Sequence, residues 1–81
     1  MTAPIPADVE LDCRGLRCPL PIIRLAHHLE DVEVGGTIAV ASTDVAARSD
    51  VPAWCRMRAQ EYVGEDRAED GVPRYVVRRL R

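Results

Sequence analysis

Alternating apolar and polar residues predict the first element of the chain, a strand over Val9–Cys13. A period of two is typical of a half-buried β-strand, and it places Val9, Leu11 and Cys13 on the inward face. A second apolar run, which follows a pair of glycines, predicts another strand over Thr37–Ser42.

Two more strands are expected in the last third of the chain. Residues 60–68 carry Tyr62 and Val63 and predict the third strand, and residues 73–80 predict the fourth. The residues between them, Glu69-Asp70-Gly71, have the composition of a hairpin turn, so these two strands are expected to pair with each other.

A helical period separates the first two strands, over residues 19–30. Its apolar stripe consists of Ile22, Leu25, Ala26 and Leu29, widened by Leu20 and Ile23. Proline is tolerated in the first turn of a helix because the N–H groups there have no intrahelical partner. Pro19 and Pro21 therefore mark the start of this helix, with Pro19 near its first position.

A second helix is predicted from Asp50 to about Ala59. Asp50 is a favourable N-cap residue, and Pro52 fits the first turn that follows it. Cys55 lies in the middle of this helix on its apolar face, together with Trp54, and is therefore expected to be a core residue.

The order of these elements, βαβαββ, predicts an α/β two-layer sandwich. In this arrangement two helices pack on one face of a four-stranded mixed sheet, and the first two strands form a βαβ unit if they are parallel. On the opposite face, the side that carries Ala39 and Ala41 is expected to be comparatively open. Residues 1–8 contain two prolines and little pattern, so we expect a loose N-terminal tail followed by one domain over residues 9–81.

The junction between the first strand and the first helix carries the candidate chemistry. Cys18 lies at or beside the expected N-cap, where Ser, Thr, Asp or Asn would be the usual choice, and Gly15 allows a tight bend just before it. The positive end of a helix dipole lowers the pKa of a thiol, and the flanking Arg14 and Arg17 would act in the same direction if they lie close. We therefore expect Cys18 to be an exposed thiol with a lowered pKa.

Size and charge narrow the classes of function. A chain of 81 residues forms one domain and buries about 60–65 % of its surface on folding, so its chemistry is expected at the surface. The formal net charge of −2 argues against direct binding of nucleic acid. We find neither a signal-peptide pattern in the first eight residues nor an apolar run of the ~20 residues that span a bilayer. We therefore expect a cytoplasmic protein without membrane contact, and a monomer.

The cysteines and histidines match no common metal site. Cys13, Cys18 and Cys55 are odd in number for a disulfide framework and lack the C-x-x-C spacing of most zinc sites. His27 and His28 are neighbours that point about 100° apart on a helix, so they cannot share one metal ion. We expect neither a metal nor a cofactor.

Three segments of the sequence resemble the TusA/SirA-like sulfur-carrier family. They are Leu11-Asp12-x-Arg14-Gly15-Leu16-x-Cys18-Pro19-x-Pro21, then Thr43-Asp44, and then Asp50-Val51-Pro52-x-Trp54-Cys55. The match runs from Val9 nearly to the C-terminus. The resemblance implies a two-layer α/β sandwich with one acceptor cysteine, which falls on Cys18. The supporting motif residues are Arg14, Gly15, Pro19 and Pro21.

The resemblance also implies a role in sulfur transfer. Members of this family accept sulfane sulfur as a persulfide from a cysteine desulfurase or a rhodanese-type donor. They pass it to a downstream acceptor protein, for tRNA thiolation, molybdenum-cofactor work or sulfur oxidation. A carrier needs a reactive thiol but no acid–base partner of its own, since its partner enzymes can supply one. We expect the partner surface to surround the start of the first helix, with Arg17 and Arg24 as candidate contacts.

Two other functions stay open. The chain also departs from the family pattern, since Cys13 is an additional thiol that only some members carry, and a second departure lies at the end of the second helix. In a thiol–disulfide protein, Cys18 would attack and Cys13 would resolve, which requires Cα atoms within about 7 Å. In a regulatory interaction module, Cys18 would be an inert cap. The second departure is Ala59-Gln60, which stands where the family often has Gly-His, so the second helix has no glycine for a left-handed cap.

Overall fold

The six predicted elements are all present in the computed structural model, which describes residues 4–81. One short 3₁₀ turn, Leu29–Asp31, follows the first helix. In chain order the elements are β1 (Val9–Cys13), α1 (Leu20–His28), β2 (Thr37–Ser42), α2 (Ala47–Arg58), β3 (Glu61–Arg67) and β4 (Pro73–Arg78). The predicted bounds of β1 and β2 are confirmed without change, and the other elements differ by one to three residues at their ends.

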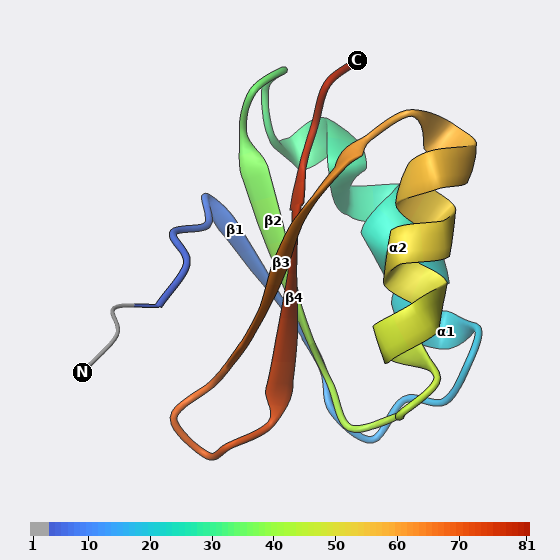
Figure 1. The fold of residues 1–81 in the computed structure, drawn as a ribbon, viewed down its shortest axis with the longest axis vertical. Helices are drawn as coiled ribbons and strands as arrows, with labels where there is room; N and C mark the ends of the chain where they lie inside the picture. Colours follow the sequence, from blue (N-terminus) through green and yellow to red (C-terminus); the bar gives the residue numbers. More distant parts are fainter. Residues whose placement is uncertain (1–3) are drawn as a thin grey trace.

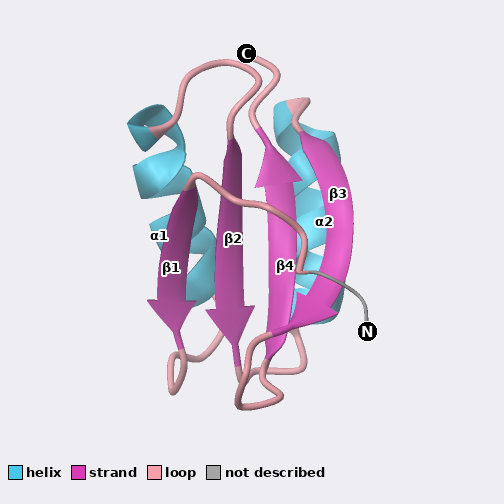
Figure 2. Cartoon of the chain, turned by 90° about the vertical axis from the view of Figure 1, so that its left-hand side faces the viewer, coloured by secondary structure: helices cyan, strands magenta, loops and turns pink. Residues whose placement is uncertain are grey.

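The sheet is mixed, as the sequence predicted, with the strand order β1-β2-β4-β3. β1 runs parallel to β2, while β4 is antiparallel to both of its neighbours. Both helices cover the same face of this sheet (Figure 1), which confirms the two-layer sandwich. The loops after β1 and β2 and the β3–β4 hairpin all lie at one end of the sheet (Figure 2).

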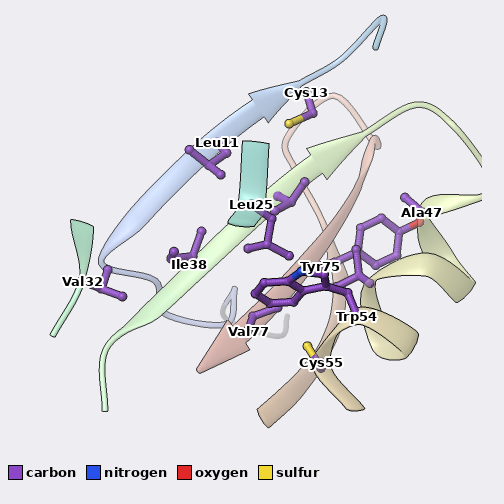
Figure 3. Packing of buried hydrophobic residues seen from close by; sticks show 12 residues of the cluster. Leu11, Cys13, Leu25, Val32, Ile38, Ala47, Trp54, Cys55, Tyr75 and Val77 are labelled. Atoms are coloured by element: carbon purple, nitrogen blue, oxygen red, sulfur yellow. The ribbon is translucent and has the colours of Figure 1, made fainter. Parts of the chain in front are cut away.

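The core lies between the helices and the sheet. Leu11 and Cys13 of β1 point into it, as the alternating pattern predicted, and Trp54 and Cys55 of α2 and Tyr75 of β4 belong to the same buried cluster (Figure 3). All five side chains are at most 6 % exposed, so burial of apolar area at this layer stabilises the fold. Cys55 is a core residue, as predicted.

Helix α1 contributes one apolar stripe to this core. Leu25 is fully buried, and Ile22, Ala26 and Leu29 are partly buried against it. The expectation that Leu20 and Ile23 widen the stripe is wrong, because they are 45 % and 54 % exposed. Their positions turn them away from the sheet and leave them on the outer surface of the helix.

Helix α2 begins earlier than the sequence predicted. Its first residue is Ala47, so Asp50 lies inside the first turns rather than at the N-cap, and Pro52 lies within the helix. The N-cap residue is Ala46, which provides no side-chain cap, and the side chain of Asp44 accepts a hydrogen bond from the Ala46 N–H at 3.0 Å in the turn that leads into the helix. The helix ends at Arg58, and its C-cap residue Ala59 adopts a left-handed conformation with φ 57° although it is not a glycine.

The expectation of an open sheet face around Ala39 and Ala41 is also wrong. Ala39 is completely buried and Ala41 is 7 % exposed. Residues 4–8, expected to be a loose tail, cross this face of the sheet (Figure 2), with the Ile5 N–H donating to the Asp66 carboxylate at 2.8 Å. The buried guanidinium of Arg74 lies on the same face. Residues 1–3 of the expected tail lie outside the described residues.

Arg74 links three strands across that face. Its guanidinium donates to Glu10 of β1 at 2.6 and 2.9 Å and to Asp66 of β3 at 2.9 and 3.1 Å. Arg74 is paired in the sheet with Ala41 of β2, whose small side chain leaves room for this reach. Among residues 4–81 no helix has the length and apolar character needed to cross a membrane.

Candidate functional site

The loop between β1 and α1 is shaped by Gly15. This residue has a φ of +79°, a conformation that other residues seldom adopt, and its N–H donates to the Thr43 side chain at 3.0 Å. Pro19 is the N-cap residue of α1 and Pro21 lies in the first turn, so the helix starts one residue later than predicted. The Cys18–Pro19 peptide bond is cis. Cys18 therefore comes immediately before the N-cap of α1.

Cys18 is exposed, while Cys13 and Cys55 are buried. The Cys18 N–H donates to the Asp44 carboxylate at 2.7 Å, and its Sγ lies 3.2 Å from Oδ2 of Asp50. Asp44 belongs to the loop after β2, and Asp50 lies in α2. Three separate segments of the chain thus meet at Cys18.

The expectation of a lowered pKa at Cys18 is wrong, because the surroundings of this thiol raise its pKa. The main cause is the hydrogen bond between the thiol and the Asp50 carboxylate, followed by partial desolvation and by the negative charges of Asp50 and Asp44. Each of these effects favours the protonated sulfur. Cys18 is therefore held as a thiol that donates to Asp50.

The flanking arginines do not act on the sulfur as the sequence suggested. Arg14 binds Asp70 of the β3–β4 hairpin at 2.9 Å and Asp12 at 3.0 Å, and both contacts raise its pKa. The charge of Arg17 acts on the Asp44 carboxylate, whose pKa is lowered mainly by the hydrogen bonds from the N–H groups of Ala46 and Cys18. Neither arginine contributes to the pKa of the thiol.

The two candidate partner contacts differ in their surroundings. The Arg24 guanidinium donates to the backbone oxygen of Asp12 at 2.6 Å, so it is held by the loop of its own domain. Arg17 is exposed and lines a hollow of about 470 Å³ together with Gly15, Thr43 and Val45. Arg17 is therefore the better placed of the two to meet another molecule.

An apolar groove of about 300 Å³ lies beside the sulfur, between α1 and α2. It is lined by Cys18, Pro19, Ile22, Asp50, Ala53, Trp54 and Met57. Asp50 supplies the charge in this lining. A reacting group that enters the groove would therefore meet one thiol and one carboxylate in otherwise apolar surroundings.

The other two thiols are shielded. Cys13 has no exposed surface and Cys55 is 1 % exposed. Burial raises the pKa of Cys13, and it raises the pKa of Cys55 to about 11. Both thiols are therefore poor nucleophiles in the folded protein. Cys13 and Cys18 are not bonded to each other.

The described residues offer no second site of comparable chemistry. Among residues 4–81 no group of three His, Cys, Asp or Glu residues is arranged to hold a metal ion. A wider hollow of about 730 Å³ lies on the far face of the sheet, but its Arg74 already binds Glu10 and Asp66. The Cys18 region is therefore the candidate site.

Sequence reasoning did not place Asp44 and Asp50 beside the sulfur. Both were noted, Asp44 as the start of a turn and Asp50 as a helix cap, and both belong to the motif segments that carry the family resemblance. Asp50 is 32 residues from Cys18 in sequence. Each of the two later motif segments contains one carboxylate, and this shared feature could have indicated that both lie near Cys18.

Comparisons with known proteins agree on one family. The family model described as "Sulfurtransferase TusA" matches residues 9–79. A putative sulfur carrier protein from Archaeoglobus fulgidus is 42 % identical over 69 residues, which cover 85 % of this chain and 90 % of the relative. The sulfur carrier protein TusA from Pseudomonas syringae pv. syringae is 39 % identical over 72 residues, with coverage of 89 % and 84 %.

A solved structure has the same fold. The crystal structure of a SirA-like protein from Desulfitobacterium hafniense matches with a TM-score of 0.75 and covers 90 % of this chain and 99 % of its own. At 20 % sequence identity, this similarity concerns the fold alone.

Proposed function

Because this chain belongs to the TusA family of sulfur carriers, we propose that it carries sulfane sulfur as a persulfide on Cys18. The observation that supports this most is the exposure of Cys18 at an apolar groove while Cys13 and Cys55 are buried. A carrier must present its sulfur to two different proteins in turn, so an exposed sulfur on a short, anchored loop suits this role.

Sulfur is transferred in two displacement steps, in each of which a thiolate attacks the outer sulfur of a persulfide. Neither step needs an oxidant or a reductant. In the first, Cys18 loses its proton and attacks the outer sulfur of the donor persulfide. The sulfur–sulfur bond of the donor breaks, its inner sulfur leaves as a thiolate that takes up a proton, and Cys18 now holds the outer sulfur. In the second, a thiolate of the acceptor attacks this outer sulfur and releases Cys18.

The partners are proteins that bring a cysteine to this groove. The donor is a cysteine desulfurase or a rhodanese-type protein, and the acceptor is a downstream sulfurtransferase or a sulfur-using enzyme. Arg17 is the main proposed partner contact, since it is exposed and directly precedes Cys18 in the same loop. The planar guanidinium group of an arginine can donate two hydrogen bonds to one carboxylate, so acidic residues are favoured on such a partner. Arg24 is a secondary contact because it already binds Asp12.

Intact mass spectrometry tests this function. The protein is incubated with a cysteine desulfurase, cysteine and pyridoxal phosphate, and a gain of about one sulfur atom is the expected result. A loss of two hydrogens would indicate the thiol–disulfide function instead. An unchanged mass would indicate an interaction module and would overturn the proposal.

A further inference from the structure

The carboxylate of Asp50 has one hydrogen-bond partner among residues 4–81, and that partner is the Cys18 sulfur at 3.2 Å. The backbone N–H of Asp50 donates to Ala46 within the helix, so its side chain is not needed to satisfy its own backbone. A carboxylate within hydrogen-bond reach of a nucleophilic thiol meets the geometric requirement for a proton acceptor.

Asp44, the second carboxylate near Cys18, has a different role. Its Oδ1 accepts from the Ala46 N–H and its Oδ2 accepts from the Cys18 N–H. Both oxygens thus hold backbone groups and fix the loop. Asp44 positions the thiol, while the Asp50 carboxylate faces the reacting atom itself.

The surroundings favour proton transfer between Cys18 and Asp50. The groove around them is lined by apolar atoms of Pro19, Ile22 and Trp54, and a docked partner would exclude water from it. The charged groups that act on the Cys18 thiol are Asp50 and Asp44, both negative, while the cation Arg17 acts on Asp44. No arginine of the described chain is therefore available to hold Cys18 as a thiolate, and the proton needs an acceptor.

Building on the persulfide relay proposed above, we propose that Asp50 takes the proton from Cys18 when sulfur arrives and supplies a proton to Cys18 when sulfur leaves. On uptake, the thiol proton moves to Asp50 Oδ2 as Cys18 Sγ bonds to the outer sulfur of the donor persulfide. The inner sulfur of the donor leaves with the electron pair of the broken bond and takes up this proton from Asp50, which becomes a carboxylate again. On release, the attacking thiol of the acceptor gives its proton to Asp50 as it bonds to the outer sulfur. The bond between Sγ and the outer sulfur breaks, and Sγ leaves as a thiolate that receives this proton from Asp50.

The variant Asp50→Asn separates this role from a simple effect of charge. An asparagine has nearly the same shape, and its Oδ1 can still accept the hydrogen bond from the thiol. Removal of the negative charge lowers the pKa of Cys18 and raises the thiolate fraction at neutral pH. As the pKa of a thiol falls, its thiolate fraction at neutral pH rises more steeply than the nucleophilicity of that thiolate declines. A variant that lost only this charge would therefore react about threefold faster for each unit by which the pKa is lowered.

The experiment measures persulfide uptake at pH 7 from glutathione persulfide, a donor too small to depend on a protein interface. If Asp50 accepts the proton, Asp50→Asn is slower than the wild type by about tenfold or more, although its alkylation midpoint moves to lower pH. Asp50→Glu keeps a carboxylate and is expected to recover part of the rate. Uptake by Asp50→Asn at or above the wild-type rate would overturn the proposal.

Two controls keep the outcomes distinct. Asp31→Asn removes an exposed carboxylate of the 3₁₀ turn, which contacts the ring of His28. This variant is expected to take up persulfide at the wild-type rate. The final amount of persulfide on wild-type Cys18 reports the proposed carrier function, whereas the rate ratio of the variants reports the role of Asp50. A wild type that takes up no sulfur refutes both proposals, and a normal wild type with an unaffected Asp50→Asn refutes only the second.

Discussion

The Cys18 N–H donates to the Asp44 carboxylate at 2.7 Å, and this bond ties the loop that carries the thiol to the start of α2. The same carboxylate accepts from the Ala46 N–H at 3.0 Å. One side chain thus fixes both the position of the sulfur and the first turn of the helix that supplies Asp50.

Asp44→Ala is therefore expected to affect both stability and sulfur transfer. Loss of the two hydrogen bonds leaves the Cys18 loop free to move, so the thiol spends less time against Asp50. We expect a lower urea midpoint and a slower persulfide uptake, by about tenfold. Urea unfolding followed by circular dichroism, and intact mass against time, measure the two effects. A variant with normal uptake would show that Asp44 does not position Cys18.

Stability is expected to fall in acid. The pKa values of Asp12, Asp44 and Asp70 are all lowered in the fold, chiefly by hydrogen bonds from Arg14 N–H, Ala46 N–H and the Arg14 side chain, respectively. A carboxyl with a lowered folded pKa stabilises the fold above its unfolded pKa, and this contribution is lost as the pH falls through the folded value.

The measurement is the urea midpoint between pH 6 and pH 2.5. A decline that begins below about pH 4 is expected, since unfolded aspartates titrate near there. The decline should be smaller in Asp70→Asn, which lacks one of the three groups. A midpoint that is flat over this range would contradict the assignment of these ionic contacts.

Cysteine alkylation in the native state is expected to occur only at Cys18. Cys13 and Cys55 are buried and have raised pKa values, while Cys18 is exposed. The pH midpoint for Cys18 should lie above that of a free thiol, because Asp50 favours the protonated sulfur. Iodoacetamide labelling against pH, with peptide mapping, reports both expectations. A midpoint below that of a free thiol would contradict the observed contact with Asp50.

Arg17→Glu is expected to slow sulfur transfer from a protein donor, because it reverses a charge at the proposed partner surface. The loss should be roughly tenfold at low salt and should shrink as salt screens the charges. Second-order transfer rates at low and high salt measure the effect.

The matched control for this variant is Arg81→Glu. Arg81 is exposed at the C-terminus, at the end of the sheet opposite the Cys18 loop (Figure 2). Arg74 is unsuitable because it is buried between Glu10 and Asp66, and its reversal would damage the fold. Equal rates for Arg17→Glu and Arg81→Glu would remove Arg17 from the interface.

Local patterns in the sequence were sufficient to predict which helices and strands the chain forms. Strict alternation predicted β1, and a β-rich apolar run predicted β2, because each pattern depends on neighbouring residues alone. The start of α2 was not predictable in the same way. The N-cap residue is Ala46, which has no capping side chain, and Asp44 holds the turn just before it. Asp50, which has the residue type of an N-cap, lies inside the helix and faces the Cys18 loop instead.

The electrostatics of the site depended on contacts between distant segments. Arg14 lies near Cys18 in sequence, but its guanidinium binds Asp70, which is 56 residues away. The Cys18 sulfur meets Asp50 only because α1 and α2 pack side by side on one face of the sheet. The residues close to Cys18 in the sequence therefore identified the exposed thiol correctly. They predicted a lowered pKa for it, whereas its surroundings in the fold raise the pKa.

Sulfur loading of Cys18 is measured most directly by comparing the wild type with Cys18→Ser after incubation with a cysteine desulfurase, cysteine and pyridoxal phosphate. A serine hydroxyl can still donate to Asp50, so the variant should keep the wild-type urea midpoint and circular dichroism. We expect one added sulfur on the wild type, mapped by peptide mass to Cys18, and none on Cys18→Ser. Sulfur uptake by Cys18→Ser at the wild-type rate would contradict this expectation.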